Sequence, residues 1–191
     1  MIYSPKYDFA FLASSKTGST SIHNYLKNIN DPNKIVKTKI GDDKHINFKK
    51  YKKKYKKNEG FSFAFVRNPW GRVLSWYFFV KNSKNPKRNS SNLSFSEFIK
   101  ERQNVWAAKP QGQFDFTEGC SFIGRMENIQ NDFNFICEKI GIEKIELKKS
   151  NSRSLIKKQE HFSFYYSQKD REIVKERFSK DIEFFNYKFK E

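Results

Sequence analysis

Two apolar runs that each end abruptly at the start of a helical pattern constrain the fold of this chain most. Phe9–Thr20 reads FAFLASSKTGST, and Phe63–Tyr77 reads FAFVRNPWGRVLSWY. A short continuous apolar run is typical of a strand covered on both faces, as in parallel sheets. A helix that follows such a strand presents backbone N–H groups and the positive end of its dipole, which favour anions. Two such junctions in one small domain predict a ligand with two separate anionic groups.

The rest of the chain alternates between strand and helix patterns, which predicts an α/β fold. We expect three layers, with a mainly parallel central sheet flanked by helices, and ligands at the carboxyl ends of its strands. The expected strands are Asp8–Ala13, Lys34–Lys39, Phe61–Val66 and Ser121–Gly124. The expected helices are Ser19–Lys27, His45–Lys57, Pro69–Lys81, a helix capped by Ser94 or Ser96 that ends near Asn104, Asn128–Ile140 and Ser167–Phe178. We expect Val105–Gly119 to be irregular and Phe184–Phe189 to form an aromatic tail.

Length and composition predict one domain that spans residues 1–191, with a core supplied largely by 21 Phe, 9 Tyr and 3 Trp residues. The two cysteines, Cys120 and Cys137, lie in apolar contexts and are expected to be buried thiols. No apolar run approaches the roughly 18 residues that span a bilayer, and the N-terminus lacks a secretory signal pattern. We therefore expect a cytoplasmic protein.

The charge is strongly positive, with 38 Lys and Arg residues against 21 Asp and Glu residues, a formal net charge of +17. Such a surface attracts polyanions and anionic cofactors. Nucleic acid, an acidic polysaccharide and an anionic membrane all fit this charge. A basic nucleic-acid- or polyanion-binding module is therefore one candidate function, although no recognition motif of a nucleic-acid-binding family is evident.

The first junction differs from the nucleotide P-loop pattern G-x-x-x-x-G-K-[ST] at decisive positions. Ala13 stands at the first glycine, and Ser19 stands at the phosphate-binding lysine. A lysine, Lys16, lies inside the loop instead, and Gly18 allows close approach of a ligand to the backbone. No acidic residue follows a later strand to hold magnesium, which weighs against a P-loop kinase. The loop predicts a P-loop-like fold that handles a phosphate-like group without a metal; an ordinary capped turn is the alternative.

At the second junction, Arg67 follows the apolar run and Ser75 follows at helical spacing. The two side chains can therefore share one side of the helix start. An arginine fork binds phosphate through two hydrogen bonds, and a serine hydroxyl adds a donor. In isolation, Arg67 could equally be a structural ion-pair partner.

Taken together, the segments KTGSTS and FVRNPWGRVLSWY resemble the two cofactor loops of sulfotransferases that use 3′-phosphoadenosine 5′-phosphosulfate (PAPS). They are most similar to the carbohydrate sulfotransferase branch (family 2), with loops PKTGSTS and R-N-P-x-x-R-x-x-S-x-Y. FIGRMENIQNDF and IVKERFSKDIEFFNYKF resemble later segments of that branch, in the same order. Ser15 replaces the usual loop proline, a change that removes no hydrogen-bond donor. Gly71 replaces a frequent Asp, and we expect this second change to cost nothing in cofactor binding.

The resemblance implies sulfuryl transfer from PAPS to an acceptor hydroxyl, on a carbohydrate or on another hydroxylated molecule, with adenosine 3′,5′-bisphosphate as product and no metal. An acidic acceptor would also match the basic charge of the chain. Lys16 would lie at the bridging and sulfuryl oxygens, and Arg67 and Ser75 would hold the 3′-phosphate. The residues implied around the 5′-phosphosulfate are Ser15, Lys16, Thr17, Gly18, Ser19 and Thr20.

The acceptor hydroxyl needs a general base, for which the resemblance implies His45. The branch often has G-H-x-[ST] where this chain has K-H-I-N. We expect His45 to open a helix, whose N-terminus would lower the proton affinity of the ring; an exposed capping histidine is the alternative. His23 is expected to be structural, and His161 either structural or in contact with substrate. The lysines of Lys49–Lys57 read as a solvated helix face that could steer an acidic glycan.

Overall fold

The computed structural model describes residues 1–29, 36–37, 45–55, 60–83, 92–105, 112–147 and 160–190. The chain divides into two compact units, which are described separately. The first contains Met1–Val66 and Asp115–Ile156, and the second contains Arg67–Phe114 and Lys157–Glu191. Within the described ranges, no helix has the length and apolarity needed to cross a bilayer.

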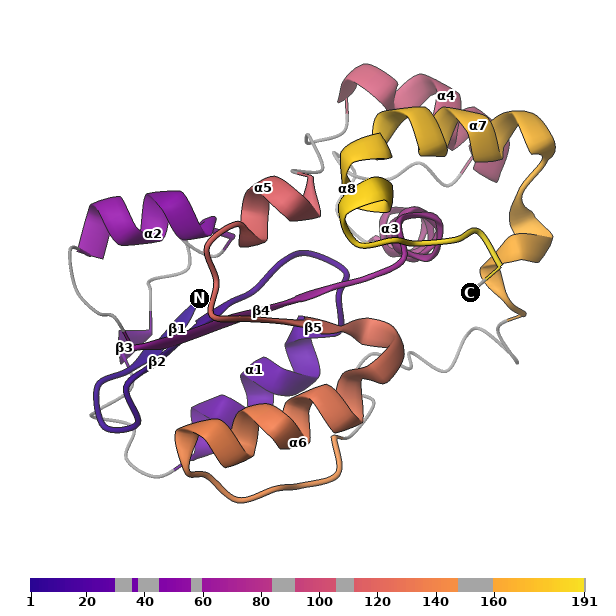
Figure 1. Cartoon of the computed structure of the whole chain (residues 1–191). Helices are drawn as coiled ribbons and strands as arrows, with labels where there is room; N and C mark the ends of the chain where they lie inside the picture. The colour runs from indigo at the N-terminus through magenta and orange to yellow at the C-terminus, as the bar shows by residue number, and fades with distance from the viewer. Residues whose placement is uncertain are drawn as a thin grey trace. The chain divides into compact units, whose positions relative to one another are not determined.

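The first unit is built on a sheet with the strand order β3-β1-β2-β4-β5 (Figure 1). The neighbours β2, β4 and β5 are parallel, whereas β1 is antiparallel to both β2 and β3. The predicted α/β fold with a mainly parallel central sheet is confirmed. The strands are β1 (Ile2–Ser4), β2 (Phe9–Leu12), β3 (Val36–Lys37), β4 (Phe61–Val66) and β5 (Phe122–Arg125).

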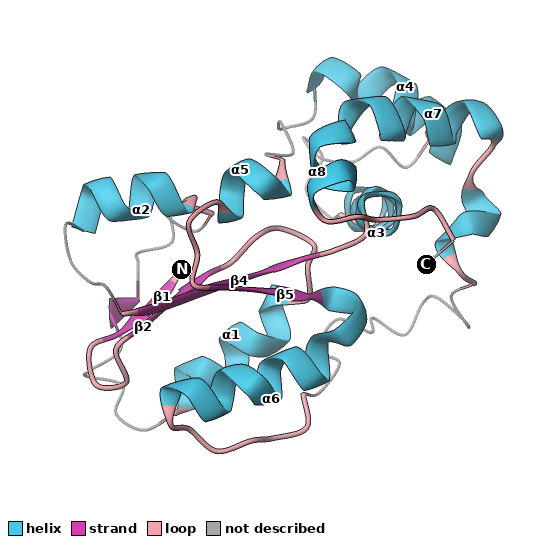
Figure 2. Ribbon diagram, in the orientation of Figure 1, coloured by secondary structure: helices cyan, strands magenta, loops and turns pink. Residues whose placement is uncertain are grey.

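Alternating side chains of the central strands serve the two faces of this sheet. On one face, phenylalanines of β2 and β4 pack with α1 (Ser19–Asn28) and α6 (Ile129–Ile140). On the other face, small and aliphatic residues of the same strands pack with Ile46 and with Tyr51 of α2 (Phe48–Tyr55). Figure 2 shows α1 and α6 together on one side of the sheet and α2 on the other. Both faces are therefore covered, as the continuous apolar runs predict.

The parallel register brings the ends of three strands to one edge of the sheet. Leu12 pairs with Ala64, and Val66 pairs with Arg125, so β2, β4 and β5 run out at the same edge. The KTGSTS loop follows β2 directly, and Arg67 is the first residue after β4.

The second unit is helical. Its helices α3, α4 and α7 contact one another around a core of aromatic and aliphatic side chains. The central members of that core are Trp70, Leu74, Tyr77, Phe98, Ile99, Val174 and Phe178. The helices are α3 (Pro69–Lys81), α4 (Phe95–Val105), the short 3-10 helix η2 (Phe162–Tyr165), α7 (Gln168–Arg177) and α8 (Ser179–Phe184).

Two short helices complete the described chain, α5 (Gln113–Thr117), which runs across the division between the units, and the 3-10 turn η1 (Met126–Asn128). The predicted strand Phe61–Val66 and helix Pro69–Lys81 match β4 and α3 at both ends. Ser94 caps α4 rather than Ser96: its Oγ accepts from the N–H of Glu97, whose Oε2 accepts from the N–H of Ser94. This reciprocal pair is a capping box.

Two expectations from the sequence are wrong. Val105–Gly119 is not irregular throughout, because it contains α5. The helix expected over His45–Lys57 begins only at Phe48. Two further elements were not expected: α8, which lies between the expected helix Ser167–Phe178 and the expected tail Phe184–Phe189, and the strand β1. Of the expected strand Lys34–Lys39, only Val36–Lys37 lies within the described residues.

Candidate active site

The loop between β2 and α1 holds its own hydroxyl groups in place. The Oγ1 of Thr17 and the Oγ of Ser19 each donate to the carbonyl oxygen of Ser14 at 3.1 Å. The N–H of Ser14 in turn donates to the carbonyl oxygen of Leu12 at 3.1 Å. Because both hydroxyl protons are used inside the loop, an anion there would be met by backbone N–H groups rather than by these hydroxyls.

The backbone of this loop has the shape of an anion-binding nest. Lys16 has φ +65° and Gly18 has φ +74°, both left-handed. Left-handed residues in alternation turn successive N–H groups to one side, which creates a concave site for anions. None of the residues in the first turn of α1 is acidic, so no side chain of that turn offsets the positive end of the helix dipole.

A side chain at position 18 would require its neighbours to move. A Cβ added there would lie 2.5 Å from Sδ of Met126 and 2.7 Å from Cδ1 of Ile129, in addition to the strain of the positive φ. Gly18 therefore lets the loop pack directly on the turn between β5 and α6.

His45 is hydrogen-bonded to the residue at which the loop begins. Its Nδ1 lies 2.7 Å from the carbonyl oxygen of Ala13. A carbonyl oxygen only accepts, so Nδ1 carries the proton, and the lone pair of the neutral ring is at Nε2. A histidine with its tautomer fixed in this way has the form that a general base needs.

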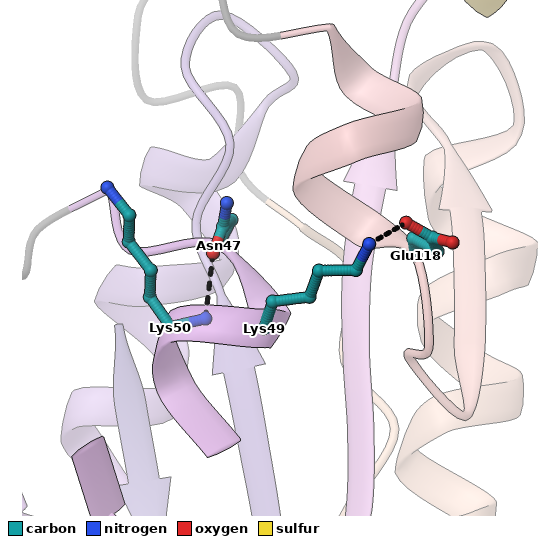
Figure 3. A network of polar contacts seen from close by, with 4 residues as sticks. All are labelled: Asn47, Lys49, Lys50 and Glu118. Carbon is teal, nitrogen blue, oxygen red and sulfur yellow. Dashed lines mark hydrogen bonds and ion pairs between the residues drawn. The ribbon is translucent and has the colours of Figure 1, made fainter. Parts of the chain in front are cut away.

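The expectation that His45 opens a helix is wrong. The residue that caps α2 is Asn47, whose Oδ1 accepts the N–H of Lys50 at 2.9 Å (Figure 3). An ion pair of 2.7 Å between Lys49 and Glu118 joins the start of α2 to the segment after α5. His45 precedes this capped start, so its orientation comes from the carbonyl group of Ala13 and not from the dipole of α2.

In the second unit, the backbone of Arg67 is held by a buried amide. The Oε1 of Gln113 accepts the N–H of Arg67, and the Nε2 of Gln113 donates to its carbonyl oxygen, both at 2.8 Å. The Nε of Arg67 lies 3.4 Å from the place that a Cβ on Gly71 would occupy. The side chain of Arg67 therefore folds over the first turn of α3, and Ser75 projects from the same face one turn later. Gly71 leaves room for this arrangement.

A buried carboxylate supports Gln113 in turn. Asp181, 1% exposed, accepts the N–H of Gln113 at Oδ2 and the N–H of Phe114 at Oδ1, both at 2.8 Å. Burial lowers the pKa of Arg72 to about 10, an effect that Asp181 opposes and Arg67 increases. Arg72 is therefore still a cation at neutral pH, and it lies within the electrostatic reach of both residues.

None of these supporting residues was expected from the sequence. Arg72 is the second arginine of R-N-P-x-x-R, and Asp181 lies in the terminal segment IVKERFSKDIEFFNYKF. Both residues therefore belong to segments that carry the family resemblance, and that resemblance could have pointed to them. Gln113 carried no such signal, because it lies in a stretch that reads as irregular.

The site residues expected from the sequence divide between the two units. His45 and the loop Ser15–Thr20 belong to the first unit, and Arg67 and Ser75 belong to the second.

Cys137 is buried, Cys120 is half-buried, and both are free thiols. In the part of the chain that the structure describes, no group of His, Cys, Asp and Glu side chains is arranged to hold a metal ion.

A mainly parallel sheet with helices on both faces and a nest-shaped loop after β2 defines an α/β protein, a class in which ligands bind at the carboxyl ends of the strands. Residues 1–188 match the Sulfotransferase family, and the chain therefore belongs to that family of enzymes.

Individual relatives are distant. The chain is 33% identical over 85 residues to an uncharacterised protein of Archaeoglobus fulgidus, over 42% of this chain and 67% of that protein. Its structure is similar to that of mouse sulfotransferase SULT7A1 complexed with PAP, with a TM-score of 0.57, 14% identity, and coverage of 94% of this chain and 86% of that one. A sulfotransferase from Alicyclobacillus acidocaldarius gives a TM-score of 0.49 and 15% identity, with 92% of each chain covered. At 14% identity the mouse structure establishes the fold alone.

Proposed function

We propose that this enzyme transfers a sulfuryl group from PAPS to a hydroxyl of a carbohydrate acceptor by in-line displacement. The observation that carries the proposal is the hydrogen bond of 2.7 Å between Nδ1 of His45 and the carbonyl oxygen of Ala13. It ties a histidine with a basic Nε2 to the start of a loop shaped for an anion. A base beside a phosphosulfate loop is what this reaction requires.

In this proposal, the backbone N–H groups of residues 15–20 hold the 5′-phosphosulfate, and Lys16 lies at its bridging oxygen. The Nε2 of His45 takes the proton of the acceptor hydroxyl as its oxygen bonds to sulfur. The bond between sulfur and the bridging oxygen breaks, and the electrons remain on the departing 5′-phosphate. Fixed donors and a cation that meet this developing charge lower the barrier without a metal ion.

Arg67 and Ser75 would bind the 3′-phosphate, which distinguishes PAPS from most adenine nucleotides. Support comes from the clamp of Gln113 on the backbone of Arg67 and from the shared face of α3. The mouse sulfotransferase of similar fold is complexed with PAP, which favours the same class of donor here. Because the family match spans both units, we further propose that residues 1–191 act as a single sulfotransferase domain.

The test is a comparison of turnover and nucleotide binding in two variants. His45→Ala should lower kcat by about 10²–10⁴-fold, the range typical of a general base, while binding of adenosine 3′,5′-bisphosphate is unchanged. Lys16→Ala should also lower kcat strongly, because its interaction strengthens in the transition state. Normal turnover by His45→Ala, measured as sulfate transferred from PAPS to a panel of glycans, would remove His45 from the mechanism.

A further inference from the structure

The second unit contains an open surface cavity of about 580 Å³, and none of its lining residues is among those assigned to the reaction above. It is formed by η2, the start of α7 and the C-terminal tail, and all of its lining residues belong to that one unit. The residues that matter for its chemistry are His161, Ser163, Phe164, Arg171, Phe189 and Lys190.

The charge of this cavity is one-sided. His161, Arg171 and Lys190 line it, and none of the described residues that line it is acidic. Asp170 of α7 is 2% exposed, and its oxygens accept from Ser96 at 2.8 Å and from Ser167 at 2.6 Å. Both oxygens of that carboxylate are therefore occupied by hydrogen bonds, and the one from Ser96 links α7 to α4. The cavity therefore favours an anionic ligand.

Arg171 is held in place but incompletely satisfied. Its guanidinium carbon lies 4.1 Å from the centroid of the Phe189 ring, and its carbonyl oxygen accepts from Nε1 of Trp70 at 3.1 Å. Its Nε is buried and has no hydrogen-bond partner among the residues described. A buried donor without an acceptor is unfavourable, so a ligand that brings an acceptor oxygen is favoured here.

The hydrogen bonds of His161 make it a second donor. Its Nδ1 accepts the backbone N–H of Ser163 at 3.4 Å and lies 2.8 Å from the Oγ of the same residue. Because a backbone N–H only donates, Nδ1 carries no proton, and the proton of the neutral ring is at Nε2. The cavity thus combines the Nε2–H donor of His161 with the cationic side chains of Arg171 and Lys190.

An aromatic face accompanies these donors. Phe164 is 76% exposed, the most exposed of the large apolar side chains in the described chain. Binding sites combine such apolar surface with a few polar groups that fix orientation. A sugar ring that carries a carboxylate or sulfate has the matching parts, an apolar ring face and anionic oxygens.

We propose that this cavity binds an anionic sugar unit of the acceptor, and so selects acidic glycans. The choice of a saccharide among anions rests on the proposed function. The charges and the unsatisfied Nε of Arg171 require only an anion with acceptor oxygens.

The experiment measures binding to the full chain by calorimetry at fixed ionic strength. The probes are a heparin-derived hexasaccharide and the neutral maltohexaose. Wild type should bind the first and not the second, and Arg171→Gln should weaken the first about tenfold or more, as expected for a hydrogen bond to a charged group. Phe164→Ala should also weaken it. Lys169→Gln is the matched control, since it removes the same charge from an exposed position on α7 that does not line the cavity.

Several outcomes would overturn the inference. Equal losses in Arg171→Gln and Lys169→Gln would indicate a general effect of charge. A single-stranded oligonucleotide of equal charge that binds as tightly, with the same dependence on Arg171, would reject a saccharide ligand. If Arg171→Gln does not fold, as judged by circular dichroism, Lys190→Gln takes its place and must weaken binding of the hexasaccharide.

The same variants separate this inference from the proposed function. Failure to bind the hexasaccharide, with intact binding of adenosine 3′,5′-bisphosphate, overturns the cavity alone. Failure to bind that nucleotide, with hexasaccharide binding that depends on Arg171, overturns the proposed donor and leaves the anion cavity.

Discussion

At the scale of single residues, backbone partners give two histidines opposite chemistry. His45 donates from Nδ1 to a carbonyl oxygen, which leaves the lone pair of the neutral ring at Nε2. His161 accepts at Nδ1 from a backbone N–H, which leaves Nε2 as a donor. The ring is the same in both cases, and the atom opposite Nδ1 determines which role is open to it.

The left-handed glycine of the anion loop gives a prediction at this scale. An alanine in the left-handed region costs about 1–2 kcal/mol, and at position 18 its Cβ must also displace Met126 and Ile129. We expect Gly18→Ala to lower the free energy of unfolding by about 2–3 kcal/mol. Denaturant titration measures this value.

Gly141 provides the matched control. It ends α6 with φ +68°, and a Cβ there would meet nothing within 4 Å. Gly141→Ala should therefore cost only the backbone strain, about 1–2 kcal/mol. If both variants lose the same free energy of unfolding, the packing of the loop on Met126 contributes nothing to stability.

At the scale of elements, α5 depends on a residue outside itself. It has five residues, too few to be stable alone, and its first N–H groups are capped by the buried carboxylate of Asp181. Through Gln113, the same carboxylate supports the backbone of Arg67 at the start of α3. The tail of the chain thus supports the arginine to which we assign the 3′-phosphate.

Asp181→Ala should therefore be strongly destabilising. It leaves two N–H groups unpaired and removes the opposite charge from the vicinity of the buried Arg72, for which a loss of about 3–5 kcal/mol is typical. Glu183→Ala removes the same charge from an exposed position on α8 and should change stability by less than about 0.5 kcal/mol. Urea unfolding of both variants tests this, and similar small losses would show that the carboxylate is not needed.

At the scale of the whole molecule, two cores of different construction share one chain. A sheet lined with phenylalanine organises the first unit, and an aromatic helical cluster organises the second. If PAPS is the donor, as we propose, adenosine 3′,5′-bisphosphate should raise the unfolding midpoint of the full chain, and magnesium–ATP should not. The reverse result in a thermal shift assay would favour the kinase alternative.

The thiols report on the integrity of the fold. Burial raises the pKa of Cys120 to about 12 and that of Cys137 to about 11. Unfolded thiols ionise near pH 8.5, so at pH 8 only the unfolded chain offers appreciable thiolate. Alkylation by iodoacetamide at pH 8 should be slow in the native protein and fast in urea. Rapid labelling without urea would contradict the burial of these residues.

The raised thiol pKa values also have a consequence for stability. Below about pH 8.5 both thiols keep their protons in the folded and in the unfolded state, and the free energy of unfolding is at its full value. Above that pH the unfolded thiols ionise while the folded ones do not, so the free energy of unfolding falls as the pH rises toward 11 and 12.

The order of strands and helices could be predicted from the sequence wherever an element follows its own local pattern. The apolar run of β4 and the proline at the start of α3 are examples, and both elements begin and end as predicted. The short elements β1 and α5 escaped prediction, because three or five residues show no period and these segments form through distant partners.

The sequence by itself determined the α/β class and the identity of the two loop motifs, because period and composition are local properties of a chain. Only the tertiary structure decided how their residues are held. His45 meets Ala13 across 32 positions, Arg67 meets Gln113 across 46, and Gln113 meets Asp181 across 68. Hydrogen bonds over such separations form when the chain closes on itself, and no local pattern specifies them.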